Sequence, residues 1–418
     1  MTRDPDWPGA SNGGSAATVV TSTDAAGRAA GSPSAAAVTG AYVDYLAVGY
    51  LLYCVGAISP YLRVQLDLSD AETGLHSSAL ALGIIAAGVV ADRLVRSRGP
   101  RLTQVAAIAL MAVASISIAW APSVVATLPA AGAVGLGCGL MIAHVNRTLG
   151  SSGDGVGRVR LARANLFSML AALAVPVVIA AGLSIGAGWQ FVAAPALAVL
   201  FVAVTYASRE PPGVAAAAPE RGHLPVEFWV AWSLVALVVS IEFSIVFWAS
   251  TLVERHAVMS LGDATMVGGA FFAGMIAGRL IISRDRSGRH DPRRLVRIGL
   301  VGALAGALLT WASTTALAGA LGFFVSGLGV AVLYPLSASL ALARGGSHES
   351  LAAARLTMAS GTAILLAPFI LGALSDHIGV VAGWVVVPAL CLASLALTMA
   401  VRPLRPAPAV DAASMLRA

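Results

Sequence analysis

Residues 88–101 read Gly-Val-Val-Ala-Asp-Arg-Leu-Val-Arg-Ser-Arg-Gly-Pro-Arg, and this stretch decides how the rest of the chain is interpreted. It begins at the end of a long apolar run and carries four arginines before the next apolar run. A second arginine-rich loop, residues 284–297, follows another apolar run about 190 residues later. Apolar runs joined by short basic loops are typical of chains that cross a membrane several times, because the positive loops stay in the cytoplasm.

The composition supports a membrane protein. The 418 residues are 58% hydrophobic and only 11% charged, and the mean hydropathy is +0.84. A soluble domain is about half apolar and about a quarter charged. A soluble fold of this length could not bury so much apolar surface, whereas helices surrounded by lipid can be apolar on every face.

The apolar runs predict an all-α, polytopic membrane protein with twelve transmembrane helices in two six-helix halves. A helix needs about 20 apolar residues to cross the hydrocarbon layer. Suitable runs occur at 41–61, 72–91, 103–121, 123–146, 162–184, 189–207, 227–252, 264–282, 297–314, 316–342, 356–375 and 379–401. The domain organisation that follows is a disordered cytoplasmic tail at 1–38, a first half at 39–207, a cytoplasmic connector at 208–226, a second half at 227–402 and a cytoplasmic tail at 403–418.

The arginines give the expected orientation. With the N-terminus inside, only Arg63 and Arg255 fall on the outer side. We therefore expect a multi-pass protein of the cell (inner or plasma) membrane with both termini in the cytoplasm.

Several classes of function are disfavoured. The net charge of +6 does not predict nucleic-acid binding, because the basic residues lie in loops between apolar runs. All 26 of them are arginine, so there is no P-loop lysine of an ATP-driven pump. The three cysteines lie inside apolar runs and predict neither a metal site nor disulfides. We expect no enzyme activity and no cofactor, and a functional monomer whose partners are the lipid bilayer and a small-molecule substrate.

The loop after the second apolar run resembles a signature of the major facilitator superfamily, G-x-x-x-D-R/K-x-G-R-R/K. Gly88, Asp92 and Arg93 match it, and Arg96 adds to the basic cluster. The resemblance implies a cytoplasmic latch in which Asp92 pairs with the other half, a helix N-terminus or Arg147. Positive-inside anchoring alone accounts for the arginines, but not for Asp92.

A second likeness is to sugar permeases of the fucose/galactose/glucose type. Helix four carries Gly135, Gly137 and Gly139 before Asn146, helix seven carries Glu242 and Ser244 before Trp248, and helix ten carries Gly327 and Gly329 before Tyr334. The acidic residue often found in helix four of that group is Ile142 here. The alternative interpretation is that the glycines only let helices approach closely. Gly278-Arg279 at the inner end of helix eight also matches the family.

Ionisable residues at membrane depth are functional candidates because they are costly there. Glu242 lies within helix seven between apolar neighbours and is suited to reversible protonation; the alternative is a structural acid. Asp44 is expected near the start of helix one, as a cap at the interface. His144 lies two residues before Asn146 and could titrate near neutral pH. We further expect Tyr50, Tyr53, Trp248 and Tyr334 to face a central cavity, although each could instead be packing.

These observations predict a secondary active transporter that works by alternating access and uses the proton gradient. Proton-coupled uptake of a small polar, sugar-like solute is favoured. The alternative is a proton-driven exporter of drugs or secondary metabolites. Helix five of such antiporters carries G-x-x-x-G-P-x-x-G-G, and the corresponding residues 171–180 keep Pro176 but none of the glycines.

Overall fold

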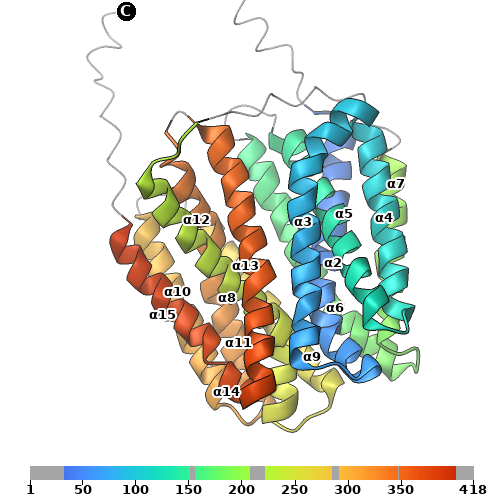
Figure 1. The fold of residues 1–418 in the computed structure, drawn as a ribbon, viewed down its shortest axis with the longest axis vertical. Coiled ribbons are helices and arrows are strands. Elements are labelled where there is room, and N and C mark those ends of the chain that lie inside the picture. Colours follow the sequence, from blue (N-terminus) through green and yellow to red (C-terminus); the bar gives the residue numbers. More distant parts are fainter. Residues whose placement is uncertain (1–32, 151–155, 208–221, 285–290, 347, 402–418) are drawn as a thin grey trace, which may run out of the picture.

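A computed structural model describes residues 33–150, 156–207, 222–284, 291–346 and 348–401 as a bundle of helices (Figure 1). The first half contains α2 (Ala35–Leu66), α3 (Asp70–Arg98), α4 (Pro100–Trp120), α5 (Val124–Gly150), α6 (Val156–Ser184), η1 (Trp189–Val192) and α7 (Ala193–Ala207). The second half contains α8 (Val226–His256), α9 (Leu261–Arg284), α10 (Pro292–Ala312), α11 (Ala316–Val330), α12 (Leu333–Leu342), α13 (Glu349–Ile378), α14 (Val380–Gly383) and α15 (Val386–Ala400). Most of the expected tails and connector lies outside the described residues.

Within the described residues, twelve helical spans are long and apolar enough to cross a membrane, which confirms the predicted number. Three spans are composite. The sixth joins η1 to α7, the tenth joins α11 to α12, and the twelfth joins α14 to α15.

The first span is longer than the sequence predicted. Helix α2 begins at Ala35, six residues before the expected run, because the Ser34 hydroxyl accepts a hydrogen bond from the amide of Ala37 and caps the helix. The helix ends where Asp67 adopts a left-handed conformation with φ of 51°. The apolar run marked the part at membrane depth, whereas the caps set the true ends.

The two halves pack against each other in a symmetric way. Helix α3, the second span of the first half, packs on α13, the fifth span of the second half. The converse pair also forms, since α6 packs on α9, and α2 meets α8 between them. Two related six-helix units placed face to face produce this reciprocal pairing.

Glycines bring helices into close contact inside each half. A Cβ atom added to Gly135 of α5 would overlap the carbonyl oxygen of Leu80 on α3. The second half repeats the arrangement, because a Cβ at Gly327 of α11 would overlap the carbonyl oxygen of Phe271 on α9. The glycines of the fourth and tenth spans therefore have a packing role, in line with the alternative interpretation of those motifs.

The two ends of the bundle differ. We call the end where α2 begins and α3 ends the basic end, since exposed Arg93, Arg96 and Arg98 lie there, and the opposite end the far end. Helix α13 lies against α3 at Gly361, which meets Ile85 near the middle of α3. The helices α3 and α13 are thus in contact toward the far end and diverge toward the basic end (Figure 1).

The expected orientation can be tested with single cysteines. His377 is exposed at the far end of α13, and Ser97 is exposed at the basic end of α3. We expect a membrane-impermeant maleimide to label His377→Cys in intact cells, and to label Ser97→Cys only after the membrane is permeabilised. The three native cysteines are buried and serve as an unlabelled background. The reverse pattern would show that the basic end faces outward.

Candidate functional site

A group of polar side chains lies between the two halves near the middle of the bundle. This central cluster consists of Tyr45 and Tyr53 of α2, Glu242 of α8, Arg279 of α9 and Tyr334 of α12. Its members are related by one hydrogen bond and by several electrostatic interactions.

The firmest contact in the central cluster joins Tyr53 to Glu242. The Tyr53 hydroxyl donates a hydrogen bond of 2.7 Å to Oε1 of Glu242, and both side chains are buried. Glu242 lies about 24 Å along α8 from Val226, at 1.5 Å per residue. The bond therefore connects the two halves at membrane depth, where a carboxylate needs a partner.

Aromatic rings close the space around this bond. The ring of Tyr53 stacks on Phe243 with centroids 5.9 Å apart, and the edge contact with Phe272 of α9 has centroids 5.1 Å apart. Both phenylalanines are buried. The Tyr53–Glu242 pair thus lies in apolar surroundings, which strengthens its hydrogen bond.

Arg279 lies toward the basic end from that pair. It follows Phe272 by seven residues, about two turns of helix, and so lies on the same face of α9. Tyr45 precedes Tyr53 by eight residues on α2, which runs in the opposite direction, so Tyr45 and Arg279 lie at a similar level. Arg279 interacts electrostatically with Glu242, Tyr53 and Tyr45.

Tyr334 completes the central cluster from the second half. It interacts electrostatically with Tyr45 and with Glu242. Its side chain is nevertheless 40% exposed, in contrast to 5% for Tyr53.

Asp44 and His144 form a separate site inside the first half. Nε2 of Gln104 on α4 donates a hydrogen bond of 2.7 Å to Oδ2 of Asp44, and Nε2 of His144 on α5 lies 3.8 Å from the same oxygen. All three are buried. The expectation that Asp44 caps helix one is wrong, because Ser34 is the cap and Asp44 lies nine residues after Ala35. Asn146, two residues beyond His144, is exposed.

Two of the aromatic residues expected in a central cavity lie elsewhere. The Tyr50 hydroxyl donates a hydrogen bond of 2.9 Å to the carbonyl of Val192, within the first half. Nε1 of Trp248 donates one of 2.9 Å to the carbonyl of Pro368, within the second half. Both side chains are almost fully buried, so they hold helices together.

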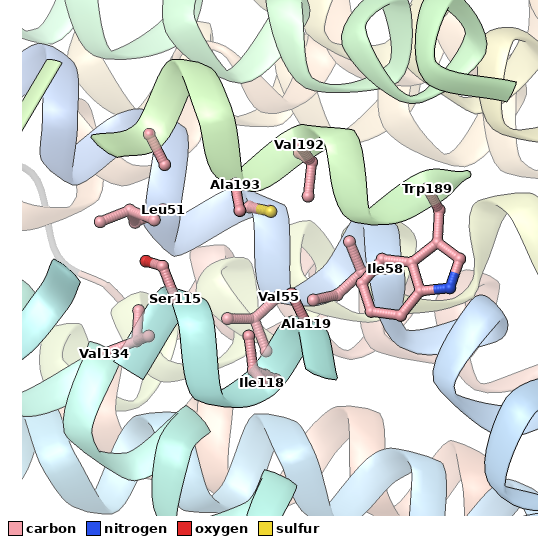
Figure 2. Close-up of a pocket in the computed structure, with 12 residues that line it drawn as sticks. Leu51, Val55, Ile58, Ser115, Ile118, Ala119, Val134, Trp189, Val192 and Ala193 are labelled. Atoms are coloured by element: carbon pink, nitrogen blue, oxygen red, sulfur yellow. The ribbon is translucent and has the colours of Figure 1, made fainter. Parts of the chain in front are cut away.

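A small cavity near Val192 does not change that conclusion. It lies inside the first half, enclosed by α2, α4, α5, η1 and α7 (Figure 2). Its lining is apolar apart from Ser115, and includes Val55, Ile118 and Trp189. Such a lining offers nothing that would orient a polar solute, so the cavity is a packing void.

The residues of the expected latch lie at the basic end. Nη1 of Arg147 on α5 lies 3.4 Å from Oδ1 of Asp92 on α3, so the structure contains this pair. Both partners belong to the first half, and Asp92 is 52% exposed. Gly88, Arg93 and Arg96 are exposed on the same helix. In this conformation the pair does not connect the halves.

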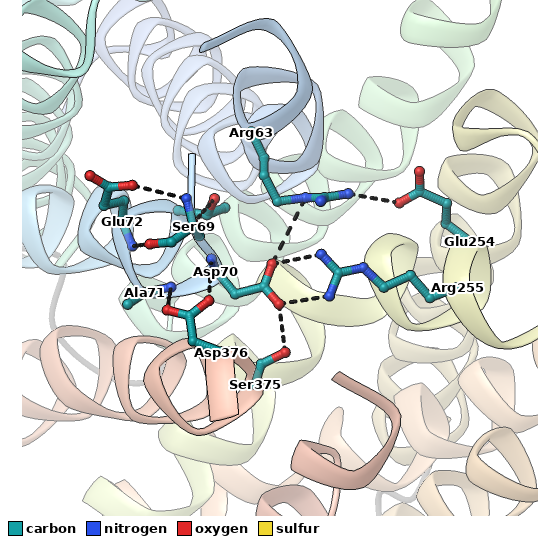
Figure 3. Close-up of polar contacts among 10 residues, drawn as sticks. Arg63, Ser69, Asp70, Ala71, Glu72, Glu254, Arg255, Ser375 and Asp376 are labelled. Carbon is teal, nitrogen blue, oxygen red and sulfur yellow. Dashed lines mark hydrogen bonds and ion pairs between the residues drawn. The ribbon is translucent and has the colours of Figure 1, made fainter. Parts of the chain in front are cut away.

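The far end, by contrast, is closed by ionic contacts between the halves (Figure 3). We call them the far-end network. Arg255 of α8 donates two hydrogen bonds, of 2.7 and 2.8 Å, to the two carboxylate oxygens of Asp70 on α3. The hydroxyl of Ser375 on α13 donates a further bond of 2.6 Å to the same carboxylate. Asp70 is buried, which makes this paired arrangement a strong one.

Two more contacts extend the far-end network. Nη2 of Arg63 on α2 donates a hydrogen bond of 3.2 Å to Glu254 of α8. The carboxylate of Asp376 on α13 accepts bonds of 2.7 and 2.9 Å from the amides of Asp70 and Ala71. Asp376 thereby caps the N-terminus of α3 from the other half, where the helix dipole favours a negative charge.

The predicted site residues did not include Arg279 or the carboxylates of the far-end network. A signal was present in the sequence for Arg279 and for the two arginines of the far-end network. Arg279 is a charge inside the apolar run 264–282, and Arg63 and Arg255 were the two arginines expected on the outer side. Their carboxylate partners stand at helix ends in the sequence, where acidic residues are common.

No protein-family model and no curated protein matches this sequence. Solved structures do resemble the fold. A bacterial homologue of the human lysosomal transporter Spinster, in an inward-facing and unoccupied conformation, is 14% identical over 89% of this chain and 98% of its own, with a TM-score of 0.67. A structure described in terms of substrate recognition in proton-dependent oligopeptide transporters is 11% identical over 88% and 97%, with a TM-score of 0.70.

The xylose transporter XylE of E. coli, in a partially occluded inward-open conformation, is 13% identical over 88% of this chain and 99% of its own, with a TM-score of 0.66. Each likeness extends over nearly the whole of the compared chain, so it concerns the complete arrangement of helices. The twelve spans, the reciprocal packing of the halves and these likenesses show that the chain has the major facilitator fold.

Proposed function

We propose that this protein is a secondary active transporter of the cell membrane that takes up a small polar solute together with protons. The observation that carries the proposal is the Tyr53–Glu242 hydrogen bond between the halves, with Arg279 beside it. A carboxylate at membrane depth on a contact between two moving units is a natural place to couple proton binding to movement. The fold is consistent with this function, since the similar solved structures named above include transporters.

Alternating access follows from the difference between the two ends. The far-end network holds the halves together on one side, while α3 and α13 diverge on the other (Figure 1). With the basic end in the cytoplasm, this is the inward-open state. Opening to the outside then requires the far-end network to break while the halves close at the basic end. The Asp92–Arg147 pair is the proposed latch of that second state.

Glu242 is the proposed proton-binding group. When it is charged, it attracts Arg279 and accepts the bond from Tyr53. When a proton neutralises it, both attractions weaken, and the contact between α2 and α8 loosens. The protonation state thereby changes the relative stability of the two conformations, which is the requirement for coupling. The proposed functional unit is one chain in the bilayer, since its two halves together supply the central cluster.

Transport, direction and coupling can be measured together in membrane vesicles. We expect right-side-out vesicles to accumulate a labelled solute from a panel of sugars such as L-fucose, D-glucose and D-xylose, and a proton ionophore to abolish the accumulation. Vesicles from cells without the protein give the background. Proton-driven loss of solutes or drugs from the same vesicles would instead identify the exporter, and absence of any movement would contradict transport.

Removal of the Glu242 charge tests the coupling role. In proteoliposomes, we expect Glu242→Gln to abolish accumulation driven by a proton gradient, while exchange of labelled for unlabelled solute continues, because glutamine can accept the Tyr53 bond but cannot carry the proton. The matched control is Glu227→Gln, which makes the same change at an exposed position on the same helix. Unchanged accumulation in Glu242→Gln would refute the role.

Weakening of the far-end network should shift the conformational equilibrium. Bonds to charged groups contribute about 1.5–3 kcal/mol each, and about 1.4 kcal/mol changes a ratio of populations tenfold. We therefore expect Asp70→Asn to raise the far-end-open population by about tenfold or more. Spin labels at Val64→Cys and His377→Cys, both exposed at the far end, should show a new longer distance.

The control for that shift is Glu72→Gln, which removes a charge from the same first turn of α3. The carboxylate of Glu72 accepts a hydrogen bond from the amide of Ser69, within its own half. The distance distribution between the two spin labels in Glu72→Gln should match that in the parent protein. An equal change in both variants would show that the far-end network does not hold the end closed.

A further inference from the structure

Arg279 stands out among the charged groups at membrane depth because no described residue binds it. No hydrogen bond or ion pair joins Arg279 to another residue in the part of the chain that the structure describes, and its Nε atom is buried. A guanidinium has five N–H donors in a planar fork. A buried donor without a partner, such as this Nε, carries a desolvation cost, and the remaining donors of the fork are free to bind a ligand.

The neighbours of Arg279 do not fill that role. Glu242 interacts with it electrostatically, but its Oε1 accepts the Tyr53 hydroxyl, and no ion pair within 4.0 Å joins Glu242 to Arg279 among the described residues. Tyr45 and Tyr53 lie within electrostatic range without bonding to it. The far-end network shows the contrast, because there Arg255 is bound at both ends of its fork by Asp70.

The position of Arg279 is that of a binding group and not that of an anchor to the cytoplasmic surface. Arg284, five residues later on the same helix, is exposed at the basic end. Arg279 instead has a buried Nε and interacts with residues of α2 and α8 at the contact between the halves. It also lies on the side of the Tyr53–Glu242 pair that faces the basic end, where α3 and α13 diverge.

We propose that Arg279 binds the carboxylate of an anionic organic substrate in the central cluster. The inference rests on the proposed transport function and narrows its substrate class from polar solutes to organic acids. A carboxylate matches the guanidinium fork with two parallel hydrogen bonds. One guanidinium balances one negative charge, and the nearby Glu242 disfavours a dianion such as phosphate. Tyr45 and Tyr334 are the members of the central cluster proposed to contact the remainder of the molecule, since both interact electrostatically within that cluster.

A site that binds through a guanidinium should distinguish acids from neutral molecules of similar shape. The test uses the purified full-length protein in detergent and three matched pairs of probes: benzoate with benzamide, lactate with lactamide, and D-galacturonate with D-galactose. The shift in melting temperature is measured against probe concentration. We expect at least one acid to stabilise the protein, and its neutral partner to bind at least about tenfold more weakly, since bonds to a charged group are lost.

Three variants locate the effect. In Arg279→Gln, affinity for the stabilising acid should fall by at least about tenfold. Arg279→Lys should lie between that variant and the parent, because lysine keeps the charge but lacks the planar fork. Arg284→Gln, which removes a charge from the exposed end of the same helix, should bind as the parent does. If Arg279→Gln fails to fold, the carboxylate site is tested by the affinity of Arg279→Lys and by the difference between acid and neutral probes in the parent protein.

The inference is overturned if no acid binds, if neutral partners bind equally well, or if Arg279→Gln retains the affinity. Transport assays in proteoliposomes separate it from the proposed function. Acids that bind through Arg279 but are not moved would leave the site intact and refute the transporter. Proton-coupled transport of D-galactose that Arg279→Gln leaves unchanged would support the transporter and refute the carboxylate site.

Discussion

The structure depends on one constraint, which is that a charge inside a membrane protein must meet an opposite charge or a hydrogen-bond partner. Most of each half satisfies it by having few charges at depth, since the helices pack through glycines and apolar side chains. Charged residues gather instead where the halves meet. Glu242 and Arg279 lie in the middle, and Asp70 with Arg255 lies at the far end. Apart from the site of Asp44, Gln104 and His144 inside the first half, the buried charges of the described residues are therefore concentrated at the contact between the halves.

This distribution separates rigid parts from a part that can rearrange. Inside a half, close helix contacts such as Gly135 on Leu80 leave no room for one helix to move on another. Across the halves, hydrogen bonds and ion pairs can be exchanged for bonds to water or to a ligand at low net cost. Two rigid halves joined by an exchangeable polar contact can rotate against each other as rigid bodies. The free-energy difference between the two conformations then depends on the few charged residues at that contact.

The sequence was sufficient for the number of spans because lipid imposes a length and an apolar composition on each one. It was sufficient to single out Glu242 because a carboxylate far from both helix ends cannot reach water and must bind a neighbouring helix. It was not sufficient to choose between Tyr50 and Tyr53. These residues lie three positions apart on α2, only about 60° apart around the helix axis, yet Tyr50 bonds to Val192 in its own half and Tyr53 bonds to Glu242 in the other half. Which side chains of α2 meet the other half depends on tertiary packing, which the apolar run of one helix does not reveal.

The arginines outside the predicted cytoplasmic loops indicate functional contacts more directly than the arginines within those loops. Positive-inside orientation accounts for arginines in cytoplasmic loops, but it gives no reason for Arg63 and Arg255 at the other end. Both bind carboxylates of the opposite half, Arg63 with Glu254 and Arg255 with Asp70. Arg279 is a third exception, since it lies within a span and not in a loop. The two far-end arginines are bound by protein carboxylates, whereas no described residue forms an ion pair with Arg279, and the same physical requirement is the basis of the proposed carboxylate ligand.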